Sequence, residues 1–552
     1  KNWFLDYASY VILERAVPAI EDGLKPVQRR ILHAMKEMDD GRFNKAANII
    51  GQSMAYHPHG DASIADALVN LGQKDLLVET QGNWGDIRTG DEAAASRYIE
   101  ARLSKFALEV AFNAKTTDWA LSYDGRKNEP VTLPMKFPLL LAQGAEGIAV
   151  GLATKILPHN FCELIEASIK YLRGRRFELL PDFQTGGIMD ASNYNDGVRG
   201  GKIRVRAVIE EADKKTLVIK SVPYGVTTTQ LMESIVKAND QGKIKIKKVT
   251  DHTAAEVEII VELAQGISPD ITIDALYAFT DCEVSISPNT CVIENNKPRF
   301  MKVSELLKTS AENTKELLRR ELEIKLGELQ EKWHYTSLEK IFFEEKIYKE
   351  LEKKHETWEK VLDAIDKAFV PFKKQLKREI TREDIIKLTE KPVRRIYKLD
   401  IDELNDQIKA LEADIKQVKH DLANLVDYAV AYYENLLKKY GKGRERKTEI
   451  KLFDTIEAKA VAIANTKLYV NRADGFIGSG LKKDEFVADV SDLDDIIAFT
   501  KGGIMKVVRV SDKTFIGKDI IHVAVFQKND ERTTYNMIYA DGKTGISFAK
   551  RF

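Results

Sequence analysis

The chain has few cysteines, and they follow no pattern that builds a disulfide framework. Its 552 residues include three cysteines, Cys162, Cys282 and Cys291, which lie far apart and form no CxxC pair. Disulfide-rich secreted domains and structural zinc sites need paired or clustered thiols, so both classes are excluded. The cysteine content therefore predicts a protein of a reducing compartment, the cytoplasm.

The sequence also lacks an excess of charge and a long apolar run. Lys plus Arg and Asp plus Glu both number 85, so any nucleic-acid binding must come from a local basic patch. The most apolar stretch, FPLLLAQGAEGIAVGLA from Phe137, is interrupted by Gln143 and Glu146 and is too short to span a bilayer. No signal peptide is visible, and because the chain starts with Lys1 we expect a trimmed N-terminus.

The sequence does contain enough apolar residues for several cores, and its patterns predict an α+β multidomain fold. Its length is typical of about three to five domains. Residues 1–135 read as mainly helical. DGLKPVQRRILHAMKEM and YHPHGDASIADALVNLGQ predict two helices with a turn-rich connection, a helix-turn-helix, with Asp61 as the N-cap of the second. A glycine-rich loop follows, and then a helix over about 93–112.

The remaining three quarters of the chain change character three times. Residues 160–300 alternate apolar and polar residues in four segments around one helical stretch, which predicts an α+β unit. Residues 303–440 are charged and helical, with a heptad seam formed by Leu404, Ile408, Leu411, Ile415, Val418, Leu422 and Leu425. The run SELLKTSAENTKELLRRELEIKLGELQEKW predicts an antiparallel partner helix, and the segment between them a globular tip.

The C-terminal part is rich in strands and glycine turns. After a basic linker, IIAFTKGGIMKVVRV and MIYADGKTGISFAKRF resemble each other at a spacing of about 41 residues. A repeat near this length predicts four-stranded blades. The chain ends inside such a strand, so we expect a truncated C-terminus.

One dipeptide, Arg97-Tyr98 in QGNWGDIRTGDEAAASRYIEARL, has a chemical as well as a structural interpretation. A phenol is a poor nucleophile at neutral pH unless neighbours stabilise its anion and the attacked group. The guanidinium of Arg97 matches a phosphate, so attack on a phosphodiester would store a strand break as a reversible phosphotyrosine. The alternative is a packed tyrosine beside a surface arginine.

Further basic groups precede this dipeptide. His57-Pro58-His59 has no third metal ligand nearby, so phosphate binding and ordinary hydrogen bonding remain open. Arg29 and Arg30 flank a helix start, where either solvent or a phosphate would satisfy them. GAEGIAVG lacks the GK[ST] of a P-loop, so no nucleotide site is predicted, and no metal site is expected in this chain.

Four stretches together resemble one family. DGLKPVQRRIL, YHPHGD, QGNWGDIRTGDEAAASRYIEARL and GIAVGLATKILPHN occur in order and resemble the A subunit of bacterial type IIA DNA topoisomerases, the breakage–reunion subunit of gyrase and topoisomerase IV. The resemblance implies a winged-helix DNA-gate domain (1–155), an α/β tower (156–302), and a long antiparallel coiled coil with a helical exit gate (303–440). A linker (441–454) and the first part of a truncated β-pinwheel (455–552) would follow.

The resemblance also implies roles for residues. Tyr98 matches the nucleophile that joins the DNA 5′-phosphate, and Arg97 the arginine that steadies it. Arg29 matches a transition-state arginine that acts near the tyrosine of the other protomer. The implied DNA contacts are His57, His59, Lys45, Arg30 and Ile156, the last as a wedge between base pairs.

Two positions depart from the family pattern. Ala62 stands where a serine usually helps to hold quinolone drugs through hydrated magnesium, although the acidic partner remains as Asp66, so we expect weakened quinolone binding. Asn48 replaces a common arginine, and we assign it no phosphate contact. The segment FIGSGLKKDEFVADVSDLDD contains no Gln/Arg/Gly-rich box of the gyrase type, which favours topoisomerase IV over gyrase.

The implied function is ATP-dependent double-strand cleavage, strand passage and religation, giving decatenation and relaxation. Mg²⁺ and ATP would both be bound by a partner B subunit, in an A2B2 complex that acts on two DNA duplexes in the cytoplasm, at the nucleoid. Two alternatives remain: the A subunit of DNA gyrase, and a non-catalytic architectural DNA-binding protein.

Overall fold

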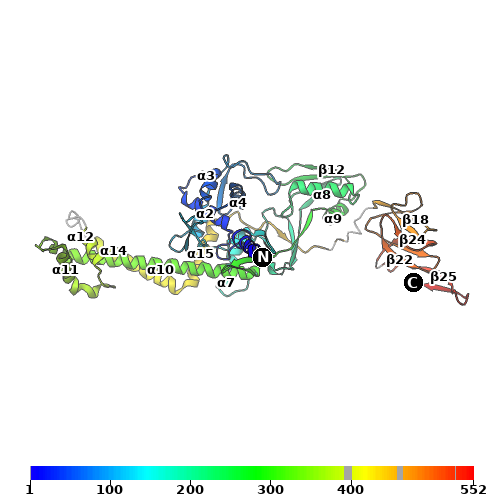
Figure 1. Ribbon diagram of the computed structural model, residues 1–552. Helices are drawn as coiled ribbons and strands as arrows, with labels where there is room; N and C mark the ends of the chain where they lie inside the picture. Colours follow the sequence, from blue (N-terminus) through cyan, green and yellow to red (C-terminus); the bar gives the residue numbers. More distant parts are fainter. Residues whose placement is uncertain (1, 391–400, 455, 457–463, 529) are drawn as a thin grey trace.

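The computed structural model describes residues 2–390, 401–454, 456, 464–528 and 530–552. The chain is elongated (Figure 1): a long helix pair projects from a central α/β body, and a separate β-rich unit lies beyond the opposite side of that body. The predicted combination of helices and sheets in one chain is confirmed. In the described part of the chain no helix is long and apolar enough to cross a membrane.

The N-terminal part of the body is built on three helices rather than the predicted two. The helices α2 (Pro26–Glu37) and α4 (Asp61–Gln73) form as expected, with Pro26 at the first position of α2. Between them lies α3 (Ala46–Ser53), which the local patterns did not predict. Gly60, not Asp61, is the N-cap of α4. These helices share one core with the strands β2 (Val78–Gln81) and β3 (Glu100–Leu103), and β1 (Asn44–Lys45) pairs with β3.

The predicted helix over 93–112 is wrong in its first half. Arg97 and Tyr98 lie in a turn, β3 follows, and only α5 (Lys105–Val110) is helical. Ile99, Ala101 and Leu103 are buried while the residues between them are not, which is the period of a strand. β3 is the central strand of the sheet β1-β3-β2, so pairing on both edges overrides the helical preference of the alanines.

Two short hairpins and two helices connect this core to the next. The strands β4 (Trp119–Leu121) and β5 (Asn128–Pro130) form the first hairpin. After α6 (Leu139–Gln143), the strands β6 (Ala145–Ala149) and β7 (Leu152–Ile156) form the second. The N-terminal segment, α1 (Asn2–Val11) and the π-helical turn η1 (Ile12–Ala16), packs against the second hairpin through η1. The helix α7 (Phe161–Leu172) follows, capped by Asn160.

The helix predicted within 160–300 is confirmed, and each of the four alternating segments contains a strand, although KIRVRAVIEE is divided into two strands of different sheets. One four-stranded sheet has the order β10-β11-β13-β12 and is covered by α8 (Thr228–Asp240) and α9 (Pro269–Phe279) over a single core. Its strands are β10 (Ile209–Asp213), β11 (Thr216–Ile219), β12 (Ile246–Asp251) and β13 (Ile259–Leu263). A second sheet has the order β14-β9-β8-β17, and β15 (Cys291–Glu294) pairs with β16 (Lys297–Phe300). The second sheet contains β8 (Ile188–Asn193), β9 (Lys202–Arg206), β14 (Glu283–Ile286) and β17 (Glu449–Ile450).

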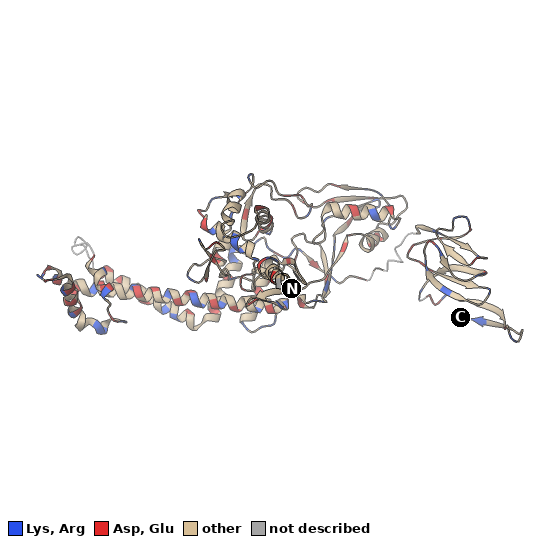
Figure 2. Cartoon of the chain, in the orientation of Figure 1, with Lys and Arg blue, Asp and Glu red and all other residues tan. Residues whose placement is uncertain are grey.

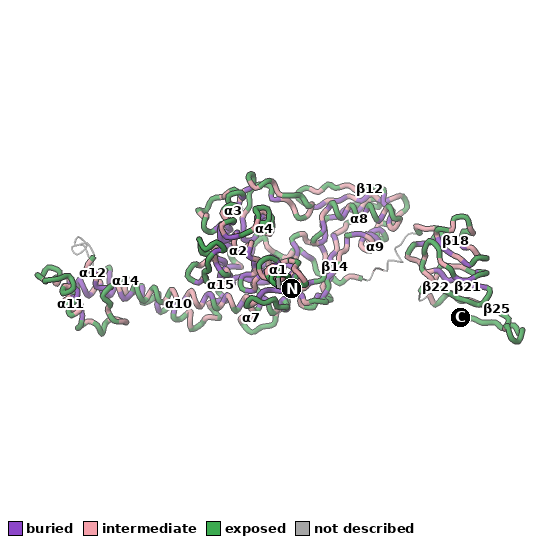
Figure 3. The backbone as a smooth tube through the Cα atoms, viewed as in Figure 1, coloured by how far each residue is buried: buried purple, intermediate pink, exposed green. Residues whose placement is uncertain are grey.

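The long helix pair consists of α10 (Val303–Glu344), 42 residues in length, and α14 (Ile401–Ala423). Trp333 of α10 packs on Leu411 and Ile415 of the predicted seam and donates its indole N–H to Glu412 at 3.1 Å. The outer faces carry charges of both signs (Figure 2), and burial follows the seam (Figure 3). The predicted globular tip is present as a core around α11 (Trp358–Phe369) and α12 (Arg382–Thr389).

The seam does not continue straight to Leu425 as predicted. At Asn424 (φ −119°, ψ 47°) the helix breaks, and α15 (Leu425–Tyr440) packs against α7 and the N-terminal core through Tyr433 and Leu436. This break brings the end of the helix pair back to the central body.

The segment 441–454, predicted to be a linker, is docked on the central body and contains one short strand. Its strand β17 adds in parallel to β8. Arg446 forms an ion pair with Glu163 and donates to two backbone carbonyls, while Asp182 accepts the backbone N–H groups of Lys447 and Thr448. Backbone pairing and these charge-assisted bonds fix the segment, so it belongs to the central body.

The C-terminal unit confirms the predicted blades in part. Among the residues described, one sheet has four strands in the order β20-β18-β19-β23, the second has three, β22-β21-β24, and β25 and β26 form a two-stranded sheet. β23 (Thr514–Phe515) comes from the second repeat yet completes the first sheet. The other strands are β18 (Thr466–Asn471), β19 (Phe476–Gly478), β20 (Glu485–Val490), β21 (Asp495–Thr500), β22 (Met505–Arg509), β24 (Ile520–Phe526), β25 (Asn536–Ala540) and β26 (Ser547–Arg551).

Candidate active site

Tyr98 is displayed on the surface by a rigid support. Its side chain is 64% exposed, while the next residue, Ile99, is buried in the core. The backbone N–H of Tyr98 donates to the carbonyl of Ala95 at 2.8 Å, which closes the turn. The guanidinium of Arg97 lies over the phenol ring, 4.6 Å from its centroid. An exposed phenol with an adjacent cation is an arrangement that suits attack on a phosphodiester.

The loop before this turn is held by one tryptophan and one glycine. Trp84 is buried and donates its indole N–H to the carbonyl of Gln81 at 3.1 Å. Gly85 has φ +78°, and a Cβ there would lie 2.4 Å from the carbonyl oxygen of Asp91. Only glycine permits this close return of the chain, so the glycine-rich loop is a compact element that fixes the position of the Arg97-Tyr98 turn.

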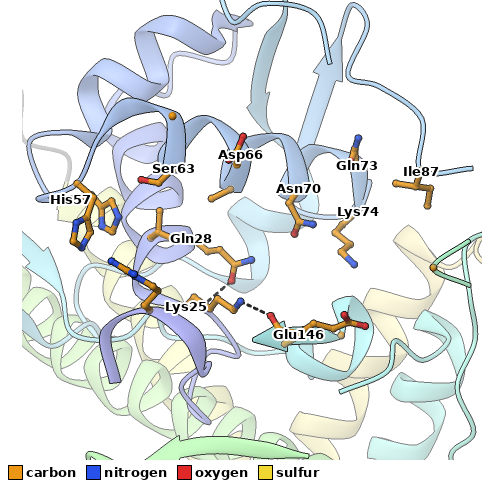
Figure 4. Close-up of a pocket in the computed structure, with 18 of the residues that line it drawn as sticks. Lys25, Gln28, His57, Ser63, Asp66, Asn70, Gln73, Lys74, Ile87 and Glu146 are labelled. Carbon is orange, nitrogen blue, oxygen red and sulfur yellow. Dashed lines mark hydrogen bonds between the residues drawn. The ribbon is translucent and has the colours of Figure 1, made fainter. Parts of the chain in front are cut away.

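A cavity of about 990 Å³ lies beneath α4. Figure 4 shows α4 as its roof, with Asn70 and Lys74 directed downwards, and Lys25, Gln28 and Glu146 as its floor. His57 stands at one end. Gln184, Thr185 and Tyr224 also line the cavity, and Gln184 is hydrogen-bonded to the backbone at the C-terminal end of α4. The predicted site residues His57, His59, Ala62 and Asp66 all line this cavity.

His57 is a neutral hydrogen-bond donor in this environment. The pKa of the His57 imidazole is lowered to about 4, mainly by burial and in addition by the nearby Arg30 guanidinium. Arg30 Nη1 lies 3.3 Å from His57 Nδ1, and because a guanidinium only donates, Nδ1 must accept. The ring proton is therefore on Nε2, which is the tautomer that donates to an anion.

His59 packs edge-on against His57, with ring centroids 4.8 Å apart. Its Nε2 is hydrogen-bonded to the hydroxyl of Tyr10 on α1. The helix α1 thus holds the second histidine in place, a role for Tyr10 that no sequence motif indicated.

The two adjacent arginines of α2 differ in their surroundings. Arg30 forms a bidentate pair with Glu129, Nε to Oε2 at 2.7 Å, at the edge of the histidine cluster. Arg29 is buried and pairs with the fully buried Asp22, Nε to Oδ2 at 2.6 Å. Arg29 does not line the cavity. Its geometry is that of a core ion pair and not of a group that faces a phosphate, so its predicted role near the transition state needs correction.

The predicted wedge residue also needs correction. Ile156 is 1% exposed and belongs to the second core, so it has no face to offer to DNA. Ile148, on the other strand of the same hairpin, is 87% exposed. Side chains alternate between faces along a strand, and a Cβ on the neighbouring Gly147 would lie 2.0 Å from the carbonyl oxygen of Ala16, so the hairpin packs closely on η1 and turns Ile148 outwards.

The remaining predicted residues are on the surface. Lys45 forms an exposed ion pair with Glu100 at 2.7 Å, next to the turn of Tyr98. Ala62 and Asp66 are exposed on the first two turns of α4. A hydroxyl does exist one residue later, but Ser63 Oγ donates to the carbonyl of Gly60 at 2.8 Å.

One cationic residue was missed. Arg15, on η1, is exposed, lines the cavity with the histidines, and contributes to the low pKa of His57. Arg15 follows a helix that contains no recognised motif, so no local pattern in the sequence indicated a role for it. Neither Arg97 nor Tyr98 lines the cavity of the same chain. Among the residues that the structure describes, no group of three or more His, Cys, Asp or Glu side chains is placed to hold a metal ion.

Comparison with known proteins gives consistent matches along the chain. Residues 15–434 match the family model of the A subunit of DNA gyrase/topoisomerase IV, and residues 467–552 match a topoisomerase C-terminal domain of Bacteroidota. The A subunit of DNA topoisomerase 4 from Borreliella burgdorferi is 41% identical, over 100% of this chain and 88% of the relative.

Gyrase subunits are also similar. The DNA gyrase A subunit of Chlamydia pneumoniae is 34% identical over 80% of this chain and 53% of its own length, and that of Streptococcus pyogenes is 30% identical over 91% and 66%. The match to the topoisomerase 4 relative extends over the whole length of this chain. It therefore belongs to the family of the DNA gyrase and topoisomerase IV A subunits, which are bacterial type II topoisomerases.

Proposed function

We propose that two copies of this chain form a DNA gate in which Tyr98 of each copy cleaves one strand. The phenol oxygen attacks the phosphorus, the tyrosyl–phosphate bond forms at the 5′ end, and the bond to the 3′ oxygen breaks. The phenol proton leaves, and the deoxyribose 3′ oxygen takes up a proton as it departs. The same bonds exchange in reverse during religation. The observation that carries this proposal is the exposed Tyr98 with the Arg97 guanidinium over its ring at 4.6 Å.

The groups of this chain would bind and orient the phosphate. Arg97 would neutralise its charge beside the phenol, and the Nε2–H of His57 would donate to a phosphate oxygen. His59, Arg30 and Lys45 would contact the adjacent backbone, while Arg29 would position α2 from inside the core. We add Arg15 to this set because it lines the same cavity as both histidines.

The tyrosine and the histidine cavity of one chain do not meet, since Tyr98 is not part of the cavity lining. We therefore propose that the site is completed between two copies, with the Tyr98 of one copy at the cavity of the other. Mg²⁺ held by a B subunit would stabilise charge on the phosphate oxygens, and ATP bound by that subunit would drive strand passage. The active complex would be an A2B2 assembly acting on two duplexes in the cytoplasm, at the nucleoid.

The same proposal assigns a role to each of the other regions of the chain. Residues 1–155 would be the winged-helix gate and 156–302 the tower, to which the docked segment 441–454 is added. Residues 303–440 would be the coiled coil and exit gate, and 455–552 the start of a β-pinwheel. The reaction would be decatenation and relaxation, as in topoisomerase IV.

We propose that Ile148, and not Ile156, is the residue that inserts between base pairs of the bound duplex. Ile148→Ala should leave stability unchanged and reduce DNA bending, measured by energy transfer between the two ends of a labelled duplex. Ile156→Ala should instead destabilise the fold by about 2–5 kcal/mol, because it opens a cavity in a packed core. Loss of bending in a stably folded Ile156→Ala variant would contradict the reassignment.

The decisive experiment traps the covalent intermediate. The full chain with its B subunit, Mg²⁺ and plasmid should give protein-linked DNA after denaturation with detergent, and Tyr98→Phe should bind DNA but give none. Tyr123→Phe is a matched control, because Tyr123 is a similarly exposed tyrosine of the same region at 59% exposure. An architectural DNA-binding protein would show no difference between wild type and Tyr98→Phe. Negative supercoiling of relaxed plasmid, rather than decatenation, would indicate the gyrase alternative.

A further inference from the structure

The cavity beneath α4 has a second basic end, away from the histidines. Lys25 on the floor and Lys74 at the end of the roof both face it (Figure 4). Lys25 Nζ donates to the backbone carbonyl of Glu146 at 2.6 Å, so its ammonium is fixed in place. Gln184 holds the opposite wall to α4 by donating to the carbonyls of Gln73 and Lys74.

This end carries more positive than negative charge. The carboxylate of Glu146 is the acidic group near both lysines, and it is already paired with Lys155 at 3.2 Å. Among the residues that the structure describes, Lys74 has no ion pair within 4.0 Å. Burial lowers the pKa of both ammonium groups, and Glu146 offsets this only in part. An anion placed between them would relieve this cost.

Neutral donors complete the site. Thr185 Oγ1 is buried without a hydrogen-bond partner in the described part of the chain, and its residue lines the cavity. Tyr224 stacks on Phe183, with ring centroids 4.5 Å apart, and also lines the wall. Two cations and one unsatisfied hydroxyl group around one space are groups that bind a phosphate.

We propose that Lys74, together with Lys25 and the wall residue Thr185, binds a backbone phosphate of the same DNA duplex at a second point, between the gate and the tower. This rests on the proposed function of the site. The helix α4 has 13 residues, so its two ends are about 20 Å apart at 1.5 Å per residue. At 3.4 Å per base pair, the second phosphate lies about six base pairs from the one at the histidines.

The site has a consequence for how the duplex is held. Contacts at both ends of α4 span the gate and the tower, so a duplex bound at both cannot slide or rotate as it would on the histidine end alone. Lys74 is thus a positioning residue for the gate duplex, one that touches DNA but not the reacting phosphate.

The test is length-dependent DNA binding by the complete A–B complex. Lys74→Gln should weaken binding of a duplex of about 30 base pairs by about fivefold near 0.15 M salt, and lower the salt slope by about 0.9, as expected for one lost phosphate contact. A duplex of about 4 base pairs closed by a hairpin loop, roughly 14 Å long and so too short to reach from the histidines to Lys74, should bind equally to both proteins. Lys74→Arg should restore binding of the long duplex.

Controls separate this proposal from its alternatives. Lys367→Gln, at an exposed position on α11 far from the cavity, should match wild type on both duplexes. Equal affinities of Lys74→Gln and wild type for the long duplex, or the same loss on both lengths, would overturn the proposal. If inorganic phosphate, compared with chloride at equal ionic strength, abolished the length effect, the site would be one for free anions and the proposal would fail.

The outcome is independent of the cleavage chemistry. The length effect should persist in Tyr98→Phe, which makes no covalent link. If wild type formed no protein-linked DNA but kept the length effect, the proposed function would fail and the second contact would stand.

Discussion

The structure and the family resemblance assign different roles to Arg29: a buried ion pair with Asp22 and a contact near the transition state. A variant of Arg29 distinguishes the two roles most directly. The Asp22 carboxylate accepts from Arg29 Nε at 2.6 Å and Nη2 at 3.0 Å, and from the backbone N–H groups of Leu24 and Leu133 at 3.1 and 3.0 Å. The Asp22 side chain is 0% exposed and that of Arg29 10%. Arg29→Met leaves a buried carboxylate without its cation, which costs about 3–5 kcal/mol when a buried pair is broken.

The two backbone donors remain in the variant, so we expect a value near the lower end, about 3 kcal/mol. At roughly 2–4 °C per kcal/mol for a domain of this size, the transition of the N-terminal domain should fall by about 6–12 °C. The assay is scanning calorimetry of the full chain, in which we expect the domains to unfold as separate transitions. Lys45→Met is the control, because its exposed pair with Glu100 is worth about 0–1 kcal/mol.

A double variant completes a double-mutant cycle for the Arg29–Asp22 pair. Asp22→Leu combined with Arg29→Met removes both buried charges and should be more stable than either single variant, since no charge is left unpaired. The reasoning would be refuted if Arg29→Met kept the wild-type transition and lost only DNA cleavage. Arg29 would then act on the phosphate, as the family resemblance implied.

The remaining predictions concern the cavity and the hairpin. The pKa of His57 is about 4 in the folded chain, below the unfolded value near 6.5, so the unfolded chain binds a proton more readily. The free energy of unfolding should therefore fall as the pH drops from 6.5 to 4. His57→Gln should reduce the difference between the denaturant midpoints at pH 7 and pH 5. Ala62→Ser should increase quinolone-stabilised cleavage of plasmid, and no gain would count against the missing hydroxyl as the cause of weak binding. Gly147→Ala should lower the melting temperature by more than Gly151→Ala, since only the first Cβ meets the backbone of Ala16, at 2.0 Å, whereas the second meets open space but has φ +74°; equal melting temperatures would show that the hairpin does not need this contact.

Local patterns were sufficient for much of the fold. The period of 3.6 residues located α2, α4 and α8, and the heptad seam located α14 and its pairing with α10. Strict alternation located the strands of the sheet β10-β11-β13-β12. In each case the buried face is set by residues a few positions apart, which a sequence displays directly. The motif residues His57 and His59 do lie together on one cavity.

The errors occurred where partners are distant in sequence. Residues Glu100–Leu103 form the strand β3 because β1 and β2 pair with it from both sides, and no helical preference of the preceding alanines can replace those bonds. The segment 441–454 contains the charges of a linker, but β8, about 260 residues earlier, offers it a free edge. Pairing with a remote edge leaves no local signal.

The order of residues was enough to establish the family, the placement of the helix pair, and Tyr98 as a candidate nucleophile after a glycine-rich loop. The surroundings of the other candidate residues became clear only in the folded chain, which turns Ile148 outwards and Ile156 inwards, buries Arg29 against Asp22, and sets Lys74 opposite Lys25. This division arises because periodicity reports which side of an element is buried, whereas the charge and space on its other side come from elements that only folding brings near.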